Sequence, residues 1–171
     1  MEPGYDLFWL ATGFSSDAEL RALPRAHPRA RNAAHVSQAY CAPVAMLAWH
    51  TAPLGVDIAV VETPDRKFAE SICTAAELSM FDSCLDDEEV ISSLLVGKRA
   101  LAKALGHPSD YDPRLLESPL TWTDGAAGDL RSRELFPTPD HVAWVVWTEP
   151  AQNSADSPSS AAFTRRRAGL N

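Results

Sequence analysis

The run from Pro53 to Glu62, with the sequence PLGVDIAVVE, most limits how this chain can fold. Its β-branched residues alternate at strand period, so the pattern predicts a strand with one face in the core. Asp57 falls on the opposite face. A carboxylate in such a strand costs free energy unless it meets a cation, a metal ion or several hydrogen-bond donors. The run therefore predicts a strand with a candidate functional carboxylate; the alternative is an Asp57 satisfied by neighbouring backbone groups.

The charge balance narrows the range of partners. The chain has 171 residues, and its 23 acidic and 15 basic side chains give a net charge of −8. This excess of negative charge argues against a nucleic-acid or anionic-membrane surface, and no apolar run is long enough for a membrane helix. The three cysteines form no CxxC pair and the start of the chain lacks a secretory pattern, so we expect a reduced, cytoplasmic protein.

A second pattern predicts a long helix over about residues 87–105. Apolar residues recur at helical spacing, Asp87 is a suitable N-cap, and Gly106 is a suitable C-terminal stop. Arg99 and Lys103 stand four residues apart and therefore share a face of this helix. Two cationic side chains on one face of a helix form either an exposed charged surface or an anion-binding site.

The remaining patterns predict a mixture of strands and helices. Strands are predicted at residues 6–12, 43–50, 120–123 and 141–148, and helices at 17–23, 65–72 and 74–81.

Two further expectations concern how these pieces connect. The short link between residues 43–50 and 55–62 predicts that these two strands form a hairpin. The segment 24–31 has two prolines and is expected to be extended. It carries Arg29 and Arg31, which are either solvated or able to clamp a phosphate with their guanidinium groups.

Three motifs in this order resemble those of the 4′-phosphopantetheinyl transferase superfamily. They are Val36-Ser37-Gln38 before a strand, Gly55-Val56-Asp57-Ile58-Ala59 on a strand, and Leu95-Val96-Gly97-Lys98-Arg99-Ala100-Leu101-Ala102-Lys103 on the long helix. Enzymes of this superfamily transfer the phosphopantetheine arm of coenzyme A to a serine of an acyl or peptidyl carrier protein. The resemblance covers about residues 33–148.

The resemblance implies an α+β fold of the two-lobed type, in which an antiparallel sheet packs against the long helix and the first lobe is reduced. The implied organisation is a first lobe at residues 1–53, a second lobe at 54–150, and a flexible tail at 151–171, which is rich in Ser, Ala and Arg.

The metal site of the superfamily is altered in this chain. In the family, the strand Asp, often a Glu two residues later, and a helix Glu hold a Mg²⁺ ion that bridges the coenzyme A pyrophosphate. Here Asp57 is retained, but Ala59 and Arg99 stand at the other two positions. A cation repels Mg²⁺ by about 4 kcal/mol per unit charge at ~4 Å in a protein. We therefore expect a salt bridge between Arg99 and Asp57 in place of a metal ion.

An anion pocket without a metal ion is a further implication of the resemblance. In the serine motif, Gln38 replaces a phosphate-contacting His, and the lysines of the helix motif are retained. Coenzyme A or phosphopantetheine is the ligand that such a pocket would hold. The candidate binding residues are Ser37, Gln38, Lys98, Arg99, Lys103, Arg29 and Arg31.

Four functions remain open from the sequence. The chain could be a pseudoenzyme of carrier-protein-dependent polyketide or nonribosomal peptide metabolism that has lost phosphopantetheinyl transfer. It could instead catalyse another reaction, such as cyclisation or isomerisation of a small-molecule or carrier-bound intermediate. A binding module for coenzyme A or a carrier protein, and an active transferase, are the other two. The candidate catalytic residues are Asp57, Arg99, Lys103, Glu62 and His50, followed by His35, Tyr40 and Cys41.

Overall fold

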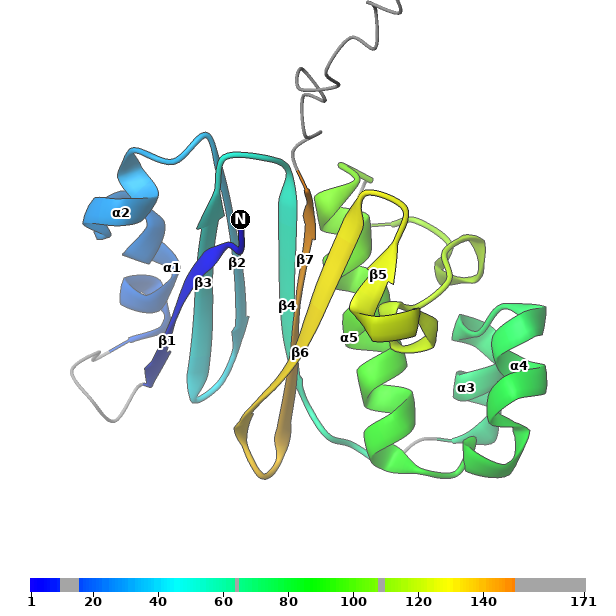
Figure 1. The fold of residues 1–171 in the computed structure, drawn as a ribbon. Coiled ribbons are helices and arrows are strands. Elements are labelled where there is room, and N and C mark those ends of the chain that lie inside the picture. The colour runs from blue at the N-terminus through cyan, green and yellow to red at the C-terminus, as the bar shows by residue number, and fades with distance from the viewer. Residues whose placement is uncertain (10–15, 64, 108–109, 150–171) are drawn as a thin grey trace, which may run out of the picture.

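The computed structural model describes residues 1–9, 16–63, 65–107 and 110–149. The fold is α+β with antiparallel sheets (Figure 1). Its elements are β1 (Gly4–Trp9), α1 (Asp17–Ala26), α2 (Pro28–Arg31), β2 (His35–Cys41), β3 (Val44–His50), β4 (Leu54–Val60), α3 (Arg66–Ile72), α4 (Ala75–Phe81), α5 (Glu88–Ala104), β5 (Ala126–Ala127), β6 (Leu130–Thr138) and β7 (His141–Thr148). Four 3₁₀ turns in the described part, at Asp82–Cys84, Pro113–Leu115, Pro119–Thr121 and Thr123–Gly125, connect them.

The strands form two sheets, with the orders β1-β3-β2 and β4-β7-β6-β5. One apolar core contains residues of both sheets, including Met46 from β3, Val56 from β4 and Val145 from β7. On its other face the second sheet packs against α5, through residues such as Trp144 and Ala100. Helix α1 lies against the first sheet, on the side of the molecule away from α5 (Figure 1). The division predicted between residues 53 and 54 stays a prediction, because the two sheets share a core.

The edge strands β2 and β4 lie side by side and form a seam between the sheets (Figure 1). The Ser37 hydroxyl on β2 accepts a hydrogen bond of 3.1 Å from the Val56 N–H on β4. A side chain thus satisfies an edge-strand donor that a neighbouring strand would otherwise pair.

Close contact between α5 and β4 depends on Gly55. A Cβ atom at this position would lie 2.0 Å from the Ala100 carbonyl oxygen and 2.5 Å from the Ala104 nitrogen. Because both of these are backbone atoms of α5, the helix can approach the strand this closely only over a glycine. This approach brings the C-terminal half of α5 directly over Asp57.

Local sequence patterns predicted several elements correctly. The Asp87 carboxylate caps α5 by accepting from the N–H groups of Glu89 and Val90, and Gly106 follows with a positive φ of 71°. The Thr74–Glu77 capping box begins α4. The terminal strand occupies residues 141–148, as predicted.

The predicted hairpin of β3 and β4 is wrong. Strand β3 pairs with β1 and β2, whereas β4 pairs with β7. The tight connection is the one between β2 and β3, at Ala42–Pro43. The chain crosses from one sheet to the other between His50 and Leu54, because the apolar faces of β3 and β4 are both buried in the shared core.

Two predictions about prolines and one about a strand are also wrong. Helix α1 continues past Pro24 to Ala26, and Pro28 occupies the first turn of α2, where a missing N–H costs nothing. Residues 120–123 form 3₁₀ turns, the first capped by the Ser118 hydroxyl, and no strand. Strand β6 was not predicted, because its charged residues interrupt the apolar pattern.

Some expectations concern residues outside the described part of the chain. These are the end of the first predicted strand, at residues 10–12, and the tail at 151–171. Among the helices of the described part, none combines the length and the apolar character needed to cross a membrane.

Candidate functional site

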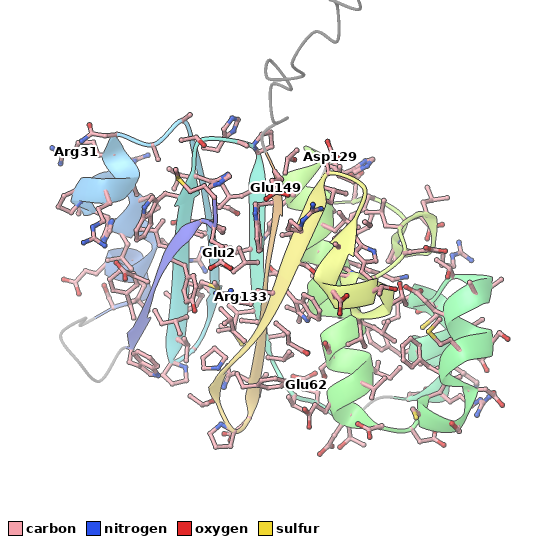
Figure 2. All side chains as sticks on the ribbon, viewed as in Figure 1. Glu2, Arg31, Glu62, Asp129, Arg133 and Glu149 are labelled. Carbon is pink, nitrogen blue, oxygen red and sulfur yellow. The ribbon has the colours of Figure 1, made fainter. Side chains whose placement is uncertain are left out.

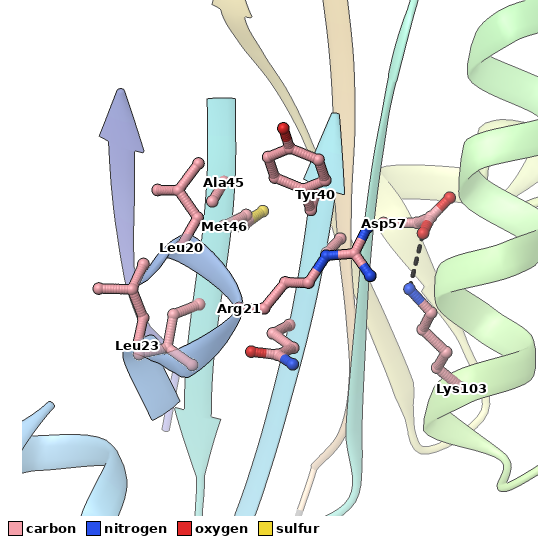
Figure 3. A pocket seen from close by; sticks show the side chains of 11 residues that line it. Leu20, Arg21, Leu23, Tyr40, Ala45, Met46, Asp57 and Lys103 are labelled. Atoms are coloured by element: carbon pink, nitrogen blue, oxygen red, sulfur yellow. Dashed lines mark hydrogen bonds and ion pairs between the residues drawn. The ribbon is translucent and has the colours of Figure 1, made fainter. Parts of the chain in front are cut away.

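A cleft of about 350 Å³ crosses the seam between the two sheets. Figure 3 shows it between α1 on one side and α5 on the other, with β2 and β4 beneath. We call it the seam cleft; its polar lining includes Arg21, Gln38, Tyr40, Asp57 and Lys103, and its apolar lining includes Leu20 and Leu47. It therefore collects side chains from both halves of the chain, the first half with β1–β3 and the second half with β4–β7.

Asp57 is held by Lys103 rather than by Arg99. The Lys103 Nζ atom lies 2.6 Å from Asp57 Oδ1, whereas the Arg99 Nη1 atom lies 3.9 Å from Asp57 Oδ2. The expected salt bridge between Arg99 and Asp57 is present, but as the longer of the two contacts. The Asp57 side chain is only 12% exposed, so its charge needs these cations.

Lys103 has a second structural role at the seam. Its amine also donates to the Val56 carbonyl oxygen at 2.8 Å. The N–H of Val56 is bound by Ser37 and its carbonyl by Lys103, so side chains satisfy both polar groups of this edge residue. Ser37 thus has a structural partner at the seam. Gln38, the next residue, is exposed and lines the cleft.

The opposite wall of the seam cleft carries Arg21, which the sequence analysis did not select. Its guanidinium carbon lies 5.6 Å from the centre of the Tyr40 ring, a cation–π distance. Figure 3 shows this side chain extending from α1 across the cleft toward β4. Arg21 follows an unremarkable helical pattern, and only the packing of α1 beside β2 brings it to the site.

Arg29 and Arg31, which were expected at this pocket, lie on the short helix α2 and are exposed. The Arg31 guanidinium donates to the Arg25 carbonyl oxygen at 3.2 Å, and Figure 2 shows Arg31 at the outer edge of the molecule. Of the arginines on the first half, it is Arg21 that lines the cleft.

Lys98, which was predicted to belong to an anion pocket, does not line the seam cleft. Its side chain is completely buried, and its amine lies 2.6 Å from the Glu77 carboxylate. The amine also donates to the carbonyl oxygens of Ile72 and Pro113, at 2.6 and 3.0 Å. Lys98 therefore ties α5 to the α3–α4 segment and to the loop that follows α5. Adjacent residues of a helix face different ways, and Lys98 faces the core while Arg99 faces solvent.

His50 also has structural partners in place of catalytic ones. The ring is buried, its Nε2 atom lies 2.9 Å from the Met1 carbonyl oxygen, and its Nδ1 atom accepts from the Ala52 N–H at 3.1 Å. Both ring nitrogens are thus engaged by backbone. Glu62 is exposed at the end of β4 (Figure 2) and lines a neighbouring hollow together with Arg99.

Tyr111 is a residue near the site that the sequence analysis missed. Its hydroxyl is buried and has no hydrogen-bond partner among the described residues. Burial raises the pKa of Tyr111 to about 12; Arg99 lowers this pKa and Asp57 raises it, each to a smaller extent. The phenol therefore stays protonated at neutral pH, and it lies close enough to Arg99 and Asp57 for their charges to act on it.

The donor set around Asp57 does not fit Mg²⁺. This ion prefers six oxygen ligands in octahedral geometry, but the neighbours of the carboxylate are an ammonium group, a guanidinium group and Ala59, which has no ligand atom. Within the described ranges, no cluster of three His, Cys, Asp or Glu side chains is placed to share a metal ion.

Neither a scan of known protein-family models nor a search of curated proteins gave a match to this chain.

Proposed function

We propose that this chain is a diverged phosphopantetheinyl transferase-like protein of carrier-protein-dependent secondary metabolism. It binds a coenzyme A- or phosphopantetheine-linked intermediate in the seam cleft and does not carry out Mg²⁺-dependent transfer. The observation that supports this most is the 2.6 Å contact of Lys103 with Asp57, since the resemblance assigns the metal to this carboxylate.

The charges of the cleft support binding of an anionic group. Arg21 and Lys103 line it, and Arg99 borders it, against the single carboxylate of Asp57. Three cations gather here in a chain whose net charge is −8. Guanidinium groups bind phosphate through paired hydrogen bonds, and they are more weakly hydrated than ammonium groups, so they lose less solvation on binding. A phosphate of the pantetheine arm matches this excess of positive charge.

The repurposed reaction would use acid–base groups rather than a metal ion. Asp57 can accept a proton, and the half-exposed Arg99 guanidinium beside it can donate a hydrogen bond to a carbonyl oxygen. Such a pair is sufficient for isomerisation, or for a cyclisation that begins with proton removal beside a carbonyl. Phosphoryl transfer, in contrast, relies on metal ions to neutralise charge on the transferring group.

A binding module without catalysis is the second candidate. It is favoured by one observation: the Lys103 amine is engaged by both Asp57 Oδ1 and the Val56 carbonyl oxygen. A lysine held in this way stabilises the fold at the seam and is less available as a proton donor.

Mass spectrometry and calorimetry test the proposal together. An apo carrier protein incubated with this protein, coenzyme A and Mg²⁺ is expected to gain no phosphopantetheine mass, while coenzyme A binds the protein with or without Mg²⁺. The Arg21→Met variant is expected to bind coenzyme A about tenfold more weakly, because it loses one charged hydrogen bond. Its matched control is Arg25→Met, on the same helix but outside the cleft. A mass gain in the carrier protein, or no coenzyme A binding at millimolar concentration, would contradict the proposal.

Restoring the carboxylates tests the altered metal site. The double variant Ala59→Glu with Arg99→Glu replaces one cation and one methyl group by two carboxylates beside Asp57. We expect calorimetry to detect Mg²⁺ binding to the double variant and none to the wild-type protein. Equal Mg²⁺ binding by both proteins would show that Arg99 does not exclude the metal ion.

A further inference from the structure

A second hollow, of about 470 Å³, lies beside the seam cleft and is larger. We call it the α3 hollow, because α3 contributes Phe68 to its wall, opposite β4 and the N-terminal half of α5. Its apolar lining includes Ile58, Phe68, Ile91 and Leu95. Phe68 is 44% exposed and adds its ring to this apolar wall. The hollow therefore offers apolar surface that the folded chain itself does not cover.

The α3 hollow and the seam cleft meet where Arg99 lies against Asp57. Tyr40 lines both of them. Arg99 lines the α3 hollow, and its Nη1 atom lies 3.9 Å from the Oδ2 atom of Asp57, which lines the seam cleft. A ligand that places its anionic part in the seam cleft can thus continue past Asp57 into the α3 hollow.

The polar groups of the α3 hollow select a neutral apolar ligand rather than a free acid. Glu62 and Asp65 carry negative charge in its lining, so a second carboxylate there would be repelled. Arg99 is half exposed and has N–H donors directed at the junction, where they can bind a carbonyl oxygen. An acyl group joined through a thioester meets all three conditions: it is neutral, apolar and begins with a carbonyl.

We infer that the α3 hollow holds the acyl group of a pantetheine thioester, with Arg99 at the thioester carbonyl and Phe68 over the acyl chain. This inference rests on the proposed function, because the seam cleft must hold the phosphate-bearing part of the same ligand. It adds the substrate class: a thioester with an apolar acyl group several carbons long, rather than coenzyme A itself.

The experiment compares coenzyme A, butyryl-coenzyme A and decanoyl-coenzyme A by calorimetry. Each methylene that becomes buried is expected to raise affinity about fourfold, so decanoyl-coenzyme A should bind at least tenfold more tightly than butyryl-coenzyme A. The Phe68→Ser variant should lose most of this gain. Its matched control is Phe136→Ser, which removes an exposed phenylalanine of β6 outside the hollow and should keep the gain.

Two free cysteines report where the acyl chain lies. Cys41 lines the α3 hollow, whereas Cys84 lies outside it, and both are partly exposed. Decanoyl-coenzyme A should slow alkylation of Cys41 by iodoacetamide, measured by peptide mass spectrometry, and leave Cys84 unaffected.

The outcomes separate this inference from the proposed function. If all three compounds bind equally and Cys41 is not protected, the inference fails while the proposed function stands. If none of them binds, both fail. A gain with chain length that is the same in Phe68→Ser and Phe136→Ser would place the acyl chain elsewhere and also overturn the inference.

Discussion

The two halves of the molecule repeat one arrangement of strands. In each half a first strand is followed by helices and then by two antiparallel strands, and the last strand lies in the centre of the sheet. The orders are β1-β3-β2 in the first half and β4-β7-β6, extended by β5, in the second. The helix that covers the outer face differs: α1 has 10 residues and α5 has 17.

The halves differ most in how tightly their first strand is packed. Every residue of β1 is partly exposed, whereas the first five residues of β4 are buried between the shared core on one face and α5 on the other. The longer helix α5 covers β4 in the second half, whereas the shorter α1 lies beside the open seam cleft. Asp57 and Lys103 therefore lie on the well-packed half, and Arg21 and Tyr40 on the more exposed one. This difference indicates that the second half fixes the geometry of the site.

The largest expected effect compares two strand glycines. At Gly55 an added Cβ would meet backbone atoms of α5 at 2.0 Å, but at Gly4 it would meet only the Trp49 ring, at 2.5 Å. A side chain can move and a packed helix backbone cannot, so we expect Gly55→Ala to lower the free energy of unfolding by more than about 4 kcal/mol and Gly4→Ala by about 1–2 kcal/mol. Urea denaturation followed by circular dichroism measures both. Equal losses would show that the two halves are packed alike.

The second comparison concerns one carboxylate contact from each half. Lys98 and Glu77 are fully buried, whereas the Asp6 side chain, which lies 2.8 Å from the His27 ring, is 44% exposed. We expect Lys98→Met to cost about 3–5 kcal/mol because it leaves a buried carboxylate unpaired, and Asp6→Asn to cost less than about 1 kcal/mol. Chemical denaturation at pH 7 tests this difference. Adding Glu77→Gln to Lys98→Met should recover part of the loss, and failure to do so would contradict the ion-pair explanation.

The smallest expected effect concerns a carboxyl group that is partly buried by the tighter packing of the second half, which lowers the free energy of unfolding at neutral pH. Glu134 on β6 accepts a hydrogen bond from Ser93, and burial raises its pKa above the ordinary value. A raised carboxyl pKa stabilises the fold at low pH, and that contribution is lost as the pH rises through the folded-state pKa. We therefore expect Glu134→Gln to raise the free energy of unfolding at pH 7 by up to about 1 kcal/mol.

Melting temperatures measured from pH 4 to pH 8 test the prediction for Glu134. The advantage of Glu134→Gln should shrink as the pH falls, while Glu117→Gln, at an exposed position, should follow the wild-type protein. A constant difference across this pH range would mean that the ionisation of Glu134 is not its cause.

The elements that could be predicted are those whose signals are local. Helix α5 has its cap at Asp87, its stop at Gly106 and its apolar periodicity within one continuous segment. The same holds for the α4 capping box and for the apolar strand β7. Pairing of β4 with β7 could not be predicted in this way, because these strands are separated by the whole helical segment of the second half.

The residues of the candidate site also fall into two groups, those marked by local sequence patterns and those set by contacts with distant segments. Asp57, Arg99 and Lys103 were selected because a strand pattern and a helix row each state which face a residue occupies. The burial of Lys98 could not be predicted, because its partner Glu77 lies on another helix. Arg21 and Tyr111 were missed for the same physical reason: neither has a sequence neighbour that reveals its role.

Sequence alone determined the helix row, the strand with its carboxylate and the net charge, since propensity, capping and periodicity act over a few residues. Tertiary structure alone decided which cation holds Asp57, which lysine is buried, and that α1 and α5 lie on the two sides of the seam cleft. Those outcomes depend on contacts between distant segments, whose free energy comes from packing both sheets around one core.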